Sequence, residues 1–248
     1  MLSPQEQLRY SRQLLLKGFA EPEQLALRNA TVLIVGIGGL GNPAALYLAG
    51  AGVGRLILAD GDNIDVTNLQ RQVIFQSDQV GNNKAEQAAE HLQKLNPEID
   101  IEVVDEQLDT EQLDYYLQEV DLVLDCTDNL TTRYAINSAC VEYKKPLISG
   151  AAIRFEGQLM VIDPRIEGNA CYQCFYPKTK GEPSLNCSTA GVMGPVLGII
   201  GSMQALEAIK VLTGKQISNN KIKLFDGLAG SWQEFNYTKR DDCPCCNR

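Results

Sequence analysis

The chain has 248 residues, of which 44% are hydrophobic and 21% charged, a globular composition that argues against a disordered or fibrous protein. Its 31 acidic residues outnumber 22 basic ones, and the net charge of −9 disfavours nonspecific binding to nucleic acid or a membrane surface. The polar start of the chain is no signal peptide, and the apolar part of its longest uncharged stretch, 191–203, is too short to span a bilayer. We therefore expect a cytoplasmic protein that engages neither nucleic acid nor membrane.

Short apolar runs alternate with helical patterns along the first 150 residues. A helix is expected at 4–16, anchored by Leu8 and Leu15, which lie a heptad apart. Strand patterns then follow at 31–35, 55–58, 99–104, 121–124 and 146–149, and the helical patterns between them are 40–51, 81–95, 111–118 and 130–141. This alternation predicts an α/β fold with a mostly parallel sheet and helices on both faces. After Gly150 the pattern changes to a strand at 158–162, a buried helix at 195–212 and an antiparallel pair at 221–225 and 232–237.

A glycine-rich turn joins the first strand to the next helix. Gly36, Gly38, Gly39 and Gly41 form a G-x-G-x-x-G pattern in the strand–turn–helix setting of Rossmann-like folds, where backbone approaches phosphates at a helix N-terminus. Asp60 ends the second strand, where an acid can hydrogen-bond a ribose hydroxyl. The pattern predicts a nucleotide site but does not distinguish NAD from ATP.

A second group of polar residues favours a triphosphate over NAD. Its members follow the second and fourth strands and are Asp62, Asn68, Arg71, Gln72, Lys84, Asp128 and Asn129. Arg71 and Lys84 can neutralise a triphosphate, and Asp128 can bind a Mg²⁺ ion on it. Taken singly, each cation could also be an ordinary solvated surface residue.

The eight cysteines of a chain expected in the cytosol point to metal or thiol chemistry rather than disulfides. Cys171 with Cys174 and Cys243 with Cys246 form two CxxC pairs that fit a closed, structural Zn²⁺ site. Cys245 is an alternative ligand within the second pair.

The other cysteines lie outside the CxxC pairs. Cys126 and Cys140 fall in apolar patterns and are expected in the core. Cys187 lies in a polar segment, where it is either a reactive thiol or an exposed residue with no essential role.

Five motifs in order resemble the ThiF/MoeB/HesA adenylyltransferases, the bacterial relatives of ubiquitin-activating enzymes. They are the glycine turn, the segments 68–72, 125–129 and 149–154, and the paired CxxC motifs. The resemblance runs from about Arg9 to the C-terminus. It implies transfer of AMP from ATP to the C-terminal glycine of a ubiquitin-fold sulfur carrier, MoaD-like or ThiS-like. The cofactors implied are ATP, Mg²⁺ and Zn²⁺, in a single domain with N-terminal helices at 1–30, a nucleotide-binding half at 31–150, and a carrier-binding and zinc half at 151–248.

The resemblance also assigns roles. Asn68, Arg71 and Lys84 would hold phosphates, Arg12 would reach the active site of the partner subunit in a homodimer, and Cys187 can bond the activated carrier. We expect no appended rhodanese domain, and therefore a separate sulfur donor, a desulfurase or rhodanese.

The carrier and the activity leave alternatives open. Segment 149–154 resembles the molybdopterin-synthase branch, whereas 43–50 and 224–227 resemble the thiamine branch. A NAD-dependent oxidoreductase and a non-catalytic nucleotide-binding scaffold are the rival functions. The joint presence of Arg12, Arg71, Lys84 and Asp128 argues against the scaffold.

Overall fold

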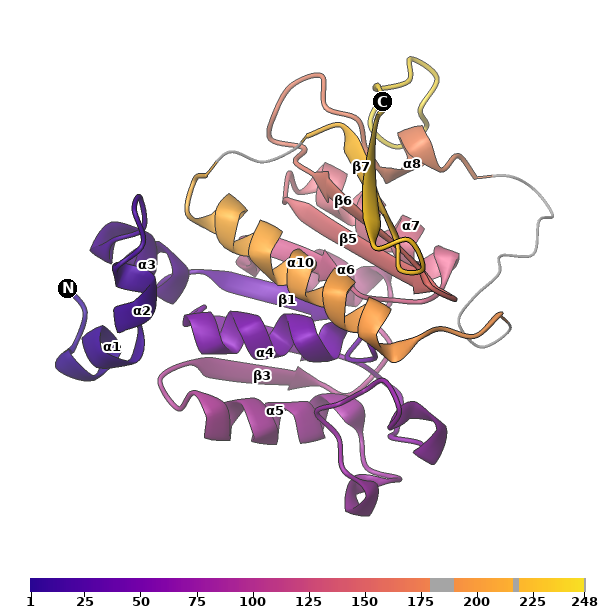
Figure 1. Ribbon diagram of the computed structural model, residues 1–248. Helices are drawn as coiled ribbons and strands as arrows, with labels where there is room; N and C mark the ends of the chain where they lie inside the picture. Colours follow the sequence, from indigo (N-terminus) through magenta and orange to yellow (C-terminus); the bar gives the residue numbers. More distant parts are fainter. Residues whose placement is uncertain (179–189, 216–218, 248) are drawn as a thin grey trace.

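The computed structural model describes residues 1–178, 190–215 and 219–247 (Figure 1). Its strands form one eight-stranded sheet in the order β3-β2-β1-β4-β5-β6-β7-β8. The strands are β1 (Thr31–Val35), β2 (Arg55–Ala59), β3 (Asp100–Val104), β4 (Leu122–Asp125), β5 (Leu147–Ile153), β6 (Glu156–Ile162), β7 (Lys221–Asp226) and β8 (Ser231–Asn236). From β3 to β5 neighbouring strands are parallel, and from β5 to β8 they are antiparallel. The predicted α/β fold, with its change of pattern after Gly150, is confirmed.

Helices cover both faces of the sheet, as predicted. The helices and 3₁₀ turns are α1 (Pro4–Arg9), α2 (Ser11–Leu14), α3 (Glu21–Arg28), α4 (Gly41–Ala51), η1 (Val66–Asn68), η2 (Ser77–Gln79), α5 (Lys84–Leu95), α6 (Thr110–Glu119), α7 (Leu130–Glu142), α8 (Tyr172–Phe175) and α10 (Gly194–Leu212). Apolar residues of α4, α5 and α10 form the core on one face, and those of α6 and α7 form the core on the other (Figure 1). Both cores therefore hold the central strands from opposite sides.

Helices α4 and α10 are apolar around most of their circumference. This fits their packing, because each helix contacts both the sheet and the other helix. Among the described residues α10 alone is long and apolar enough to span a membrane, but half of its apolar window is buried inside the protein. The core helices of soluble proteins pass the same test. Glu207 within α10 is buried and its charge is paired with Lys210 and Lys223.

The N-terminal helix departs from the expectation. Instead of one helix at 4–16, the chain forms α1 and α2, which meet at Tyr10. Tyr10 is buried and its hydroxyl accepts a hydrogen bond from Asn96 Nδ2 at 2.9 Å. Leu8 and Leu15, which the heptad spacing predicted as anchors, are 79% and 75% exposed. The prediction is wrong because the buried tyrosine, not the leucine stripe, attaches this segment to its own chain.

Candidate functional site

A cavity of about 780 Å³ opens at the carboxyl ends of the parallel strands. Strands β1 and β4 are neighbours, and Val35 and Asp125 at their ends are paired in register. The chain leaves β1 toward β2 and β3 on one side, whereas β5 lies on the other side of β4. Open α/β sheets bind ligands at such a reversal of strand order.

The glycine turn forms one wall of this cavity. Gly36 has φ +89°, and an added Cβ would lie 2.9 Å from the Cys126 carbonyl oxygen, so a side chain here meets both strain and backbone. Gly36, Gly38 and Gly39 line the cavity. Gly41 does not line it; a Cβ there would overlap the Gly36 carbonyl oxygen, so this glycine lets α4 pack against the turn.

Asp60 is buried beneath the turn and tied to it. Its Oδ2 accepts a hydrogen bond from the Ile37 amide at 2.7 Å, and its Oδ1 accepts one from the Asp62 amide at 2.9 Å. Burial raises the pKa of this carboxyl, although Lys84 and the two amides favour the charged form. Each carboxylate oxygen retains a lone pair, so Asp60 can still accept a hydrogen bond from a hydroxyl group of a ligand in the cavity.

Two cations reach the cavity, one from the start of helix α5 and one from the turn that follows η1. Lys84 begins α5, is buried, and pairs through Nζ with Asp62 Oδ2 at 2.8 Å. Arg71 donates from Nη1 to the Thr67 carbonyl at 2.9 Å. The structure therefore places both predicted phosphate-binding cations on the cavity wall.

The amides predicted with these cations also line the cavity. Asn68 accepts from the Asp65 amide at 3.3 Å, and the buried Gln72 has an Oε1 atom without a hydrogen-bond partner among the described residues. Because this oxygen has almost no accessible surface, Gln72 contributes to the cavity wall without presenting that acceptor to a ligand.

Asp128 and Asn129 follow β4 at the rim. Asn129 Oδ1 accepts a hydrogen bond from the Thr132 amide at 2.9 Å and caps α7. Asp128 is exposed and lines the cavity. One carboxylate in a cavity with two cations is a protein donor set that Mg²⁺ commonly uses with a nucleotide, since it keeps several waters and takes further oxygens from the phosphates. The residues therefore fit a magnesium–nucleotide complex.

A second site joins α8 to the C-terminal segment. The sulfur atoms of Cys171, Cys174, Cys243 and Cys246 lie within 4.8 Å of one another. The separations Cys171–Cys243, Cys174–Cys246 and Cys171–Cys174 are 3.6, 3.4 and 4.0 Å. A tetrahedral Zn²⁺ with bonds of about 2.3 Å separates its sulfurs by about 3.8 Å. The three measured separations lie on both sides of that value, so the cluster fits a tetrahedral Zn²⁺. Cys245 lies beside it and accepts a hydrogen bond from Asn137 at 3.2 Å.

The family model "ThiF family" matches residues 10–245 of this chain. The chain belongs to the ThiF family. It is 46% identical over 239 residues to the sulfur carrier protein ThiS adenylyltransferase of Escherichia coli, covering 96% of this chain and 94% of that protein. It is 45% identical over 248 residues to the molybdopterin-synthase adenylyltransferase of E. coli, covering 100% and 99%. The predicted family is confirmed.

Longer and more distant relatives share this family domain. The chain is 41% identical to the adenylyltransferase and sulfurtransferase MOCS3 of Culex quinquefasciatus, covering 99% of this chain but 56% of that protein. A crystal structure of E. coli MccB superimposes with a TM-score of 0.86 at 26% identity, covering 100% of this chain and 76% of that one. The ThiF fold therefore accounts for the whole sheet of this protein.

Besides Gly41, two residues predicted to act at the nucleotide or the carrier lie away from the cavity or outside the described residues. Arg12 on α2 is exposed, does not line the cavity, and forms no hydrogen bond or ion pair within the described chain. Cys187 lies outside the described residues. Cys126 and Cys140 are buried in the core, as predicted, and burial raises the pKa of both thiols.

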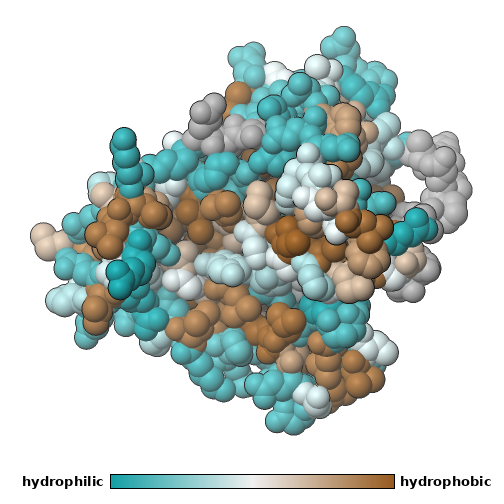
Figure 2. Space-filling model, viewed as in Figure 1, coloured by the Kyte–Doolittle hydropathy of each residue, from teal (hydrophilic) through white to brown (hydrophobic). Residues whose placement is uncertain are grey.

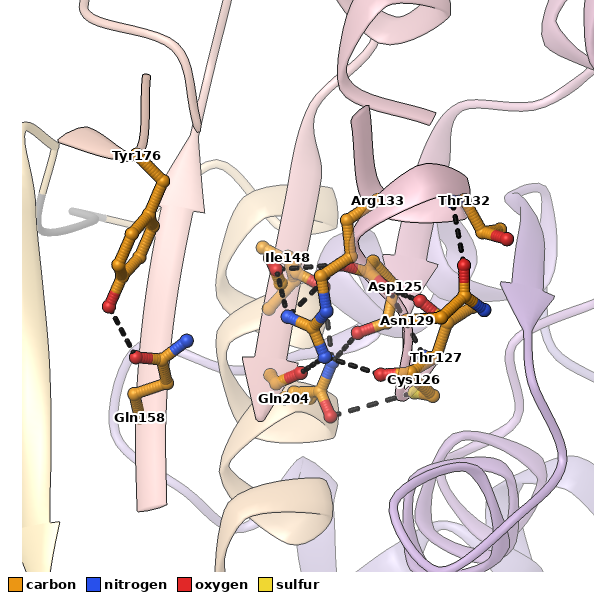
Figure 3. A network of polar contacts seen from close by, with 12 residues as sticks. Asp125, Cys126, Thr127, Asn129, Thr132, Arg133, Ile148, Gln158, Tyr176 and Gln204 are labelled. Carbon is orange, nitrogen blue, oxygen red and sulfur yellow. Dashed lines mark hydrogen bonds and ion pairs between the residues drawn. The ribbon is translucent and has the colours of Figure 1, made fainter. Parts of the chain in front are cut away.

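Sequence reasoning missed a buried network between β4, β5 and α7 (Figure 3). Arg133 on α7 lies 3.4 Å from Asp125 Oδ2, and Ser149 donates to the same oxygen at 2.7 Å. Arginine is seldom buried without a partner. An acid at the end of an apolar strand, followed by an arginine in the next helix, was the sequence signal that could have indicated this buried ion pair.

The far half of the cavity was also missed. It is lined by strands β5 to β8 and by two tyrosines, and Tyr176 donates to Gln158 Oε1 at 2.7 Å (Figure 3). Its lining is neutral apart from Glu156, Asp226 and Arg133, and the charge of Arg133 is paired with Asp125. This half contrasts with the charged, glycine-lined half.

Proposed function

We propose that this protein transfers AMP from ATP to the C-terminal glycine carboxylate of a small ubiquitin-fold sulfur carrier, releasing pyrophosphate. The observation that carries the proposal is one cavity that joins a glycine turn, two cations and an exposed carboxylate to a largely neutral second half. The adenylyltransferase names of relatives that match nearly the whole chain support this activity over a NAD-dependent oxidoreductase or a scaffold.

Adenylyl transfer needs no nucleophile from the protein. A carrier carboxylate oxygen attacks the α-phosphorus, the new P–O bond forms, and the bond to the bridging oxygen of the β-phosphate breaks as pyrophosphate leaves. Catalysis then depends on alignment and on neutralising the departing charge. The chain can supply both, since Asp60, Arg71 and Lys84 line one cavity, where Asp60 would hold the ribose and the two cations would neutralise the phosphates.

Magnesium would screen charge on the triphosphate when it is bound with ATP. Asp128 is the side chain assigned to it, and Asn129 fixes the backbone beside that residue. Lys84 shares its charge with Asp62 in this structure, so nucleotide phosphate would compete with Asp62 for Nζ.

The neutral half of the cavity is assigned to the tail of the carrier. An extended, uncharged tail ending in glycine suits this half of the cavity, which is lined by the small residues Ala151 and Gly157 and by Tyr172 and Tyr176. Both MoaD-like and ThiS-like carriers fit this description, and the relatives include proteins named for each branch. A separate desulfurase or rhodanese would supply the sulfur.

The proposal includes a homodimer in the cytoplasm. The N-terminal segment exposes Leu8, Leu15 and Leu16 at 79%, 75% and 60%, and apolar surface is visible there at the left of Figure 2. Exposed apolar side chains gathered on one segment favour a protein interface. Arg12 lies within the same segment, as a residue serving the partner subunit should.

The remaining assignments concern the architecture. We assign one structural Zn²⁺ to Cys171, Cys174, Cys243 and Cys246, because a closed set of four thiolates leaves no position for substrate. The sheet shared by both halves supports a single domain over 1–248.

Carrier-dependent exchange of labelled pyrophosphate into ATP tests the activity. MoaD-like and ThiS-like carriers would be compared, each with a control lacking its C-terminal glycine. Exchange with one intact carrier and none with its control is expected. No exchange with any carrier would contradict the proposal.

A further inference from the structure

Strands β4 and β5 separate at the edge of the cavity. Their pairing ends at Asp125 and Ser149, while β5 continues to Ile153 paired only with β6. Backbone carbonyls that leave a ladder inside a protein need other donors. Side chains that donate hydrogen bonds to the carbonyls around this separation can therefore fix the geometry of the backbone at the site.

Two buried side chains satisfy these carbonyls from opposite faces of the sheet (Figure 3). From α10, Gln204 Nε2 donates to the carbonyls of Asp125 and Ile148 at 2.8 and 3.1 Å. From α7, Arg133 Nη2 donates to the carbonyl of Gly150 at 2.7 Å and to that of Thr127. Arg133 thus connects the turn after β4 to the continuing strand β5.

The charge of Arg133 is balanced within the same turn. Asp125 Oδ2 lies 3.4 Å from Nη1, and Ser149 Oγ bridges the pair, accepting from Nη1 at 3.3 Å and donating to Asp125 at 2.7 Å. Burial alone would lower the pKa of Arg133, but the Asp125 carboxylate raises it above its ordinary value. Asp125 Oδ1 accepts from both the amide and the hydroxyl of Thr127, at 3.1 and 2.7 Å.

These contacts fix the residues on both sides of Asp128. Thr127 is held at its amide, hydroxyl and carbonyl, and Asn129 is held by capping α7. Asp128 itself forms no hydrogen bond or ion pair within the described residues, and it faces the cavity. A free carboxylate on a fixed backbone is preorganised for a ligand.

We infer that Arg133 is a positioning residue that holds the turn 126–129 so that Asp128 meets the magnesium of the bound nucleotide. The inference rests on the proposed function. The planar guanidinium is required, because a lysine ammonium keeps the charge but lacks the fork that reaches two carbonyls and a hydroxyl together. Groups behind a metal ligand commonly change metal affinity or activity about 10- to 100-fold when removed.

Arg133→Lys tests the inference, with Glu207→Gln as a matched control. Glu207 is also a buried, ion-paired residue, but it does not line the cavity. Binding of ATP without carrier would be measured by calorimetry at a series of fixed Mg²⁺ concentrations, together with carrier-dependent pyrophosphate exchange, zinc content and melting temperature. For Arg133→Lys we expect the half-maximal Mg²⁺ concentration to rise about tenfold. The KM for carrier should stay unchanged, and Glu207→Gln should alter the melting temperature alone.

A double-mutant comparison separates positioning from a general loss of stability. In the Asp128→Ala background, Arg133→Lys should add little to the Mg²⁺ requirement, because both changes remove the same interaction. A full additional loss, or an unchanged Mg²⁺ requirement in Arg133→Lys, would overturn the inference. If Arg133→Lys does not fold, Ser149→Ala, which removes the bridging hydroxyl, should raise the requirement severalfold, and no change would overturn the inference.

The inference and the proposed function can fail separately. If the wild-type protein exchanges pyrophosphate but Arg133→Lys behaves like Glu207→Gln, the role of Arg133 is wrong and the function stands. If no carrier supports exchange, the function is wrong, and the Mg²⁺ dependence of ATP binding still decides whether Arg133 positions Asp128.

Discussion

Arg12 is expected to serve the nucleotide cavity of a second subunit. Tyr10 attaches its segment to Gly52 and Asn96, the C-terminal caps of α4 and α5. These ends of α4 and α5 lie on the side of the N-terminal helices (Figure 1), whereas the cavity opens at the carboxyl ends of the parallel strands. Helix α4 begins at the glycine turn and ends at Gly52, and its 11 residues span about 16 Å at 1.5 Å per residue. The side chain of Arg12 is too short to bridge that distance within its own chain.

Mixing two inactive variants tests this geometry. Arg12→Ala and Asp128→Ala proteins should each lose pyrophosphate exchange, and a mixed dimer should contain one doubly defective site and one intact site. With free subunit exchange at equal amounts, half of the dimers are mixed, so activity should recover to about a quarter of wild type. Lys17→Ala removes another exposed cation of the segment and should keep full activity.

The controls decide between action within one chain and action across the interface. Subunit exchange would be confirmed by native mass spectrometry of differently tagged subunits. Mixed dimers without recovered exchange would refute the assignment of Arg12 to the partner site. Arginines supplied across an interface stabilise transferred phosphate in other nucleotide enzymes, which is the effect expected here.

Three further outcomes follow from the structure. Asp128→Ala should lower exchange about 100-fold or more with an unchanged melting temperature, since it removes charge stabilisation at an exposed position; near-wild-type exchange would contradict its role. Cys243→Ser should lower both zinc content and melting temperature, whereas Cys245→Ser should retain one zinc per chain by metal analysis. Hydrogen bonding to the Ala20 amide, aided by Lys215, lowers the pKa of Glu23 to about 2, so its contribution to stability is complete above pH 4.5 and is lost as the pH falls toward 2. The difference in melting temperature between wild type and Glu23→Gln should shrink over that range, and a constant difference would contradict it.

The glycine-lined half of the cavity could be predicted because its signals are local. A strand, a glycine turn and a helix follow one another in sequence, so Gly36, Gly38 and Gly39 identify the turn without knowledge of the fold. The end of each parallel strand likewise places Asp60 and Asp128 at one edge of the sheet.

The residues that were missed depend on contacts between distant segments. Arg133 bonds to groups 6, 16 and 17 residues away, and its partners become neighbours only when β5 pairs with β4. The heptad of Leu8 and Leu15 indicated an apolar surface but could not show what covers it. The spacing of apolar residues identifies the apolar face of a helix, whereas the surface that packs against this face is set by the tertiary or quaternary structure.

The central claim is that this protein forms a carrier acyl-adenylate, and intact mass spectrometry tests it most directly. The protein would be incubated with ATP, Mg²⁺ and either a MoaD-like or a ThiS-like carrier, with the Asp128→Ala protein as control. We predict that one carrier gains the mass of an adenylyl group, that the gain is lost on mild hydrolysis, and that the control shows none. ATP binding without any adenylylated carrier, under conditions in which an E. coli relative produces it, would contradict the account.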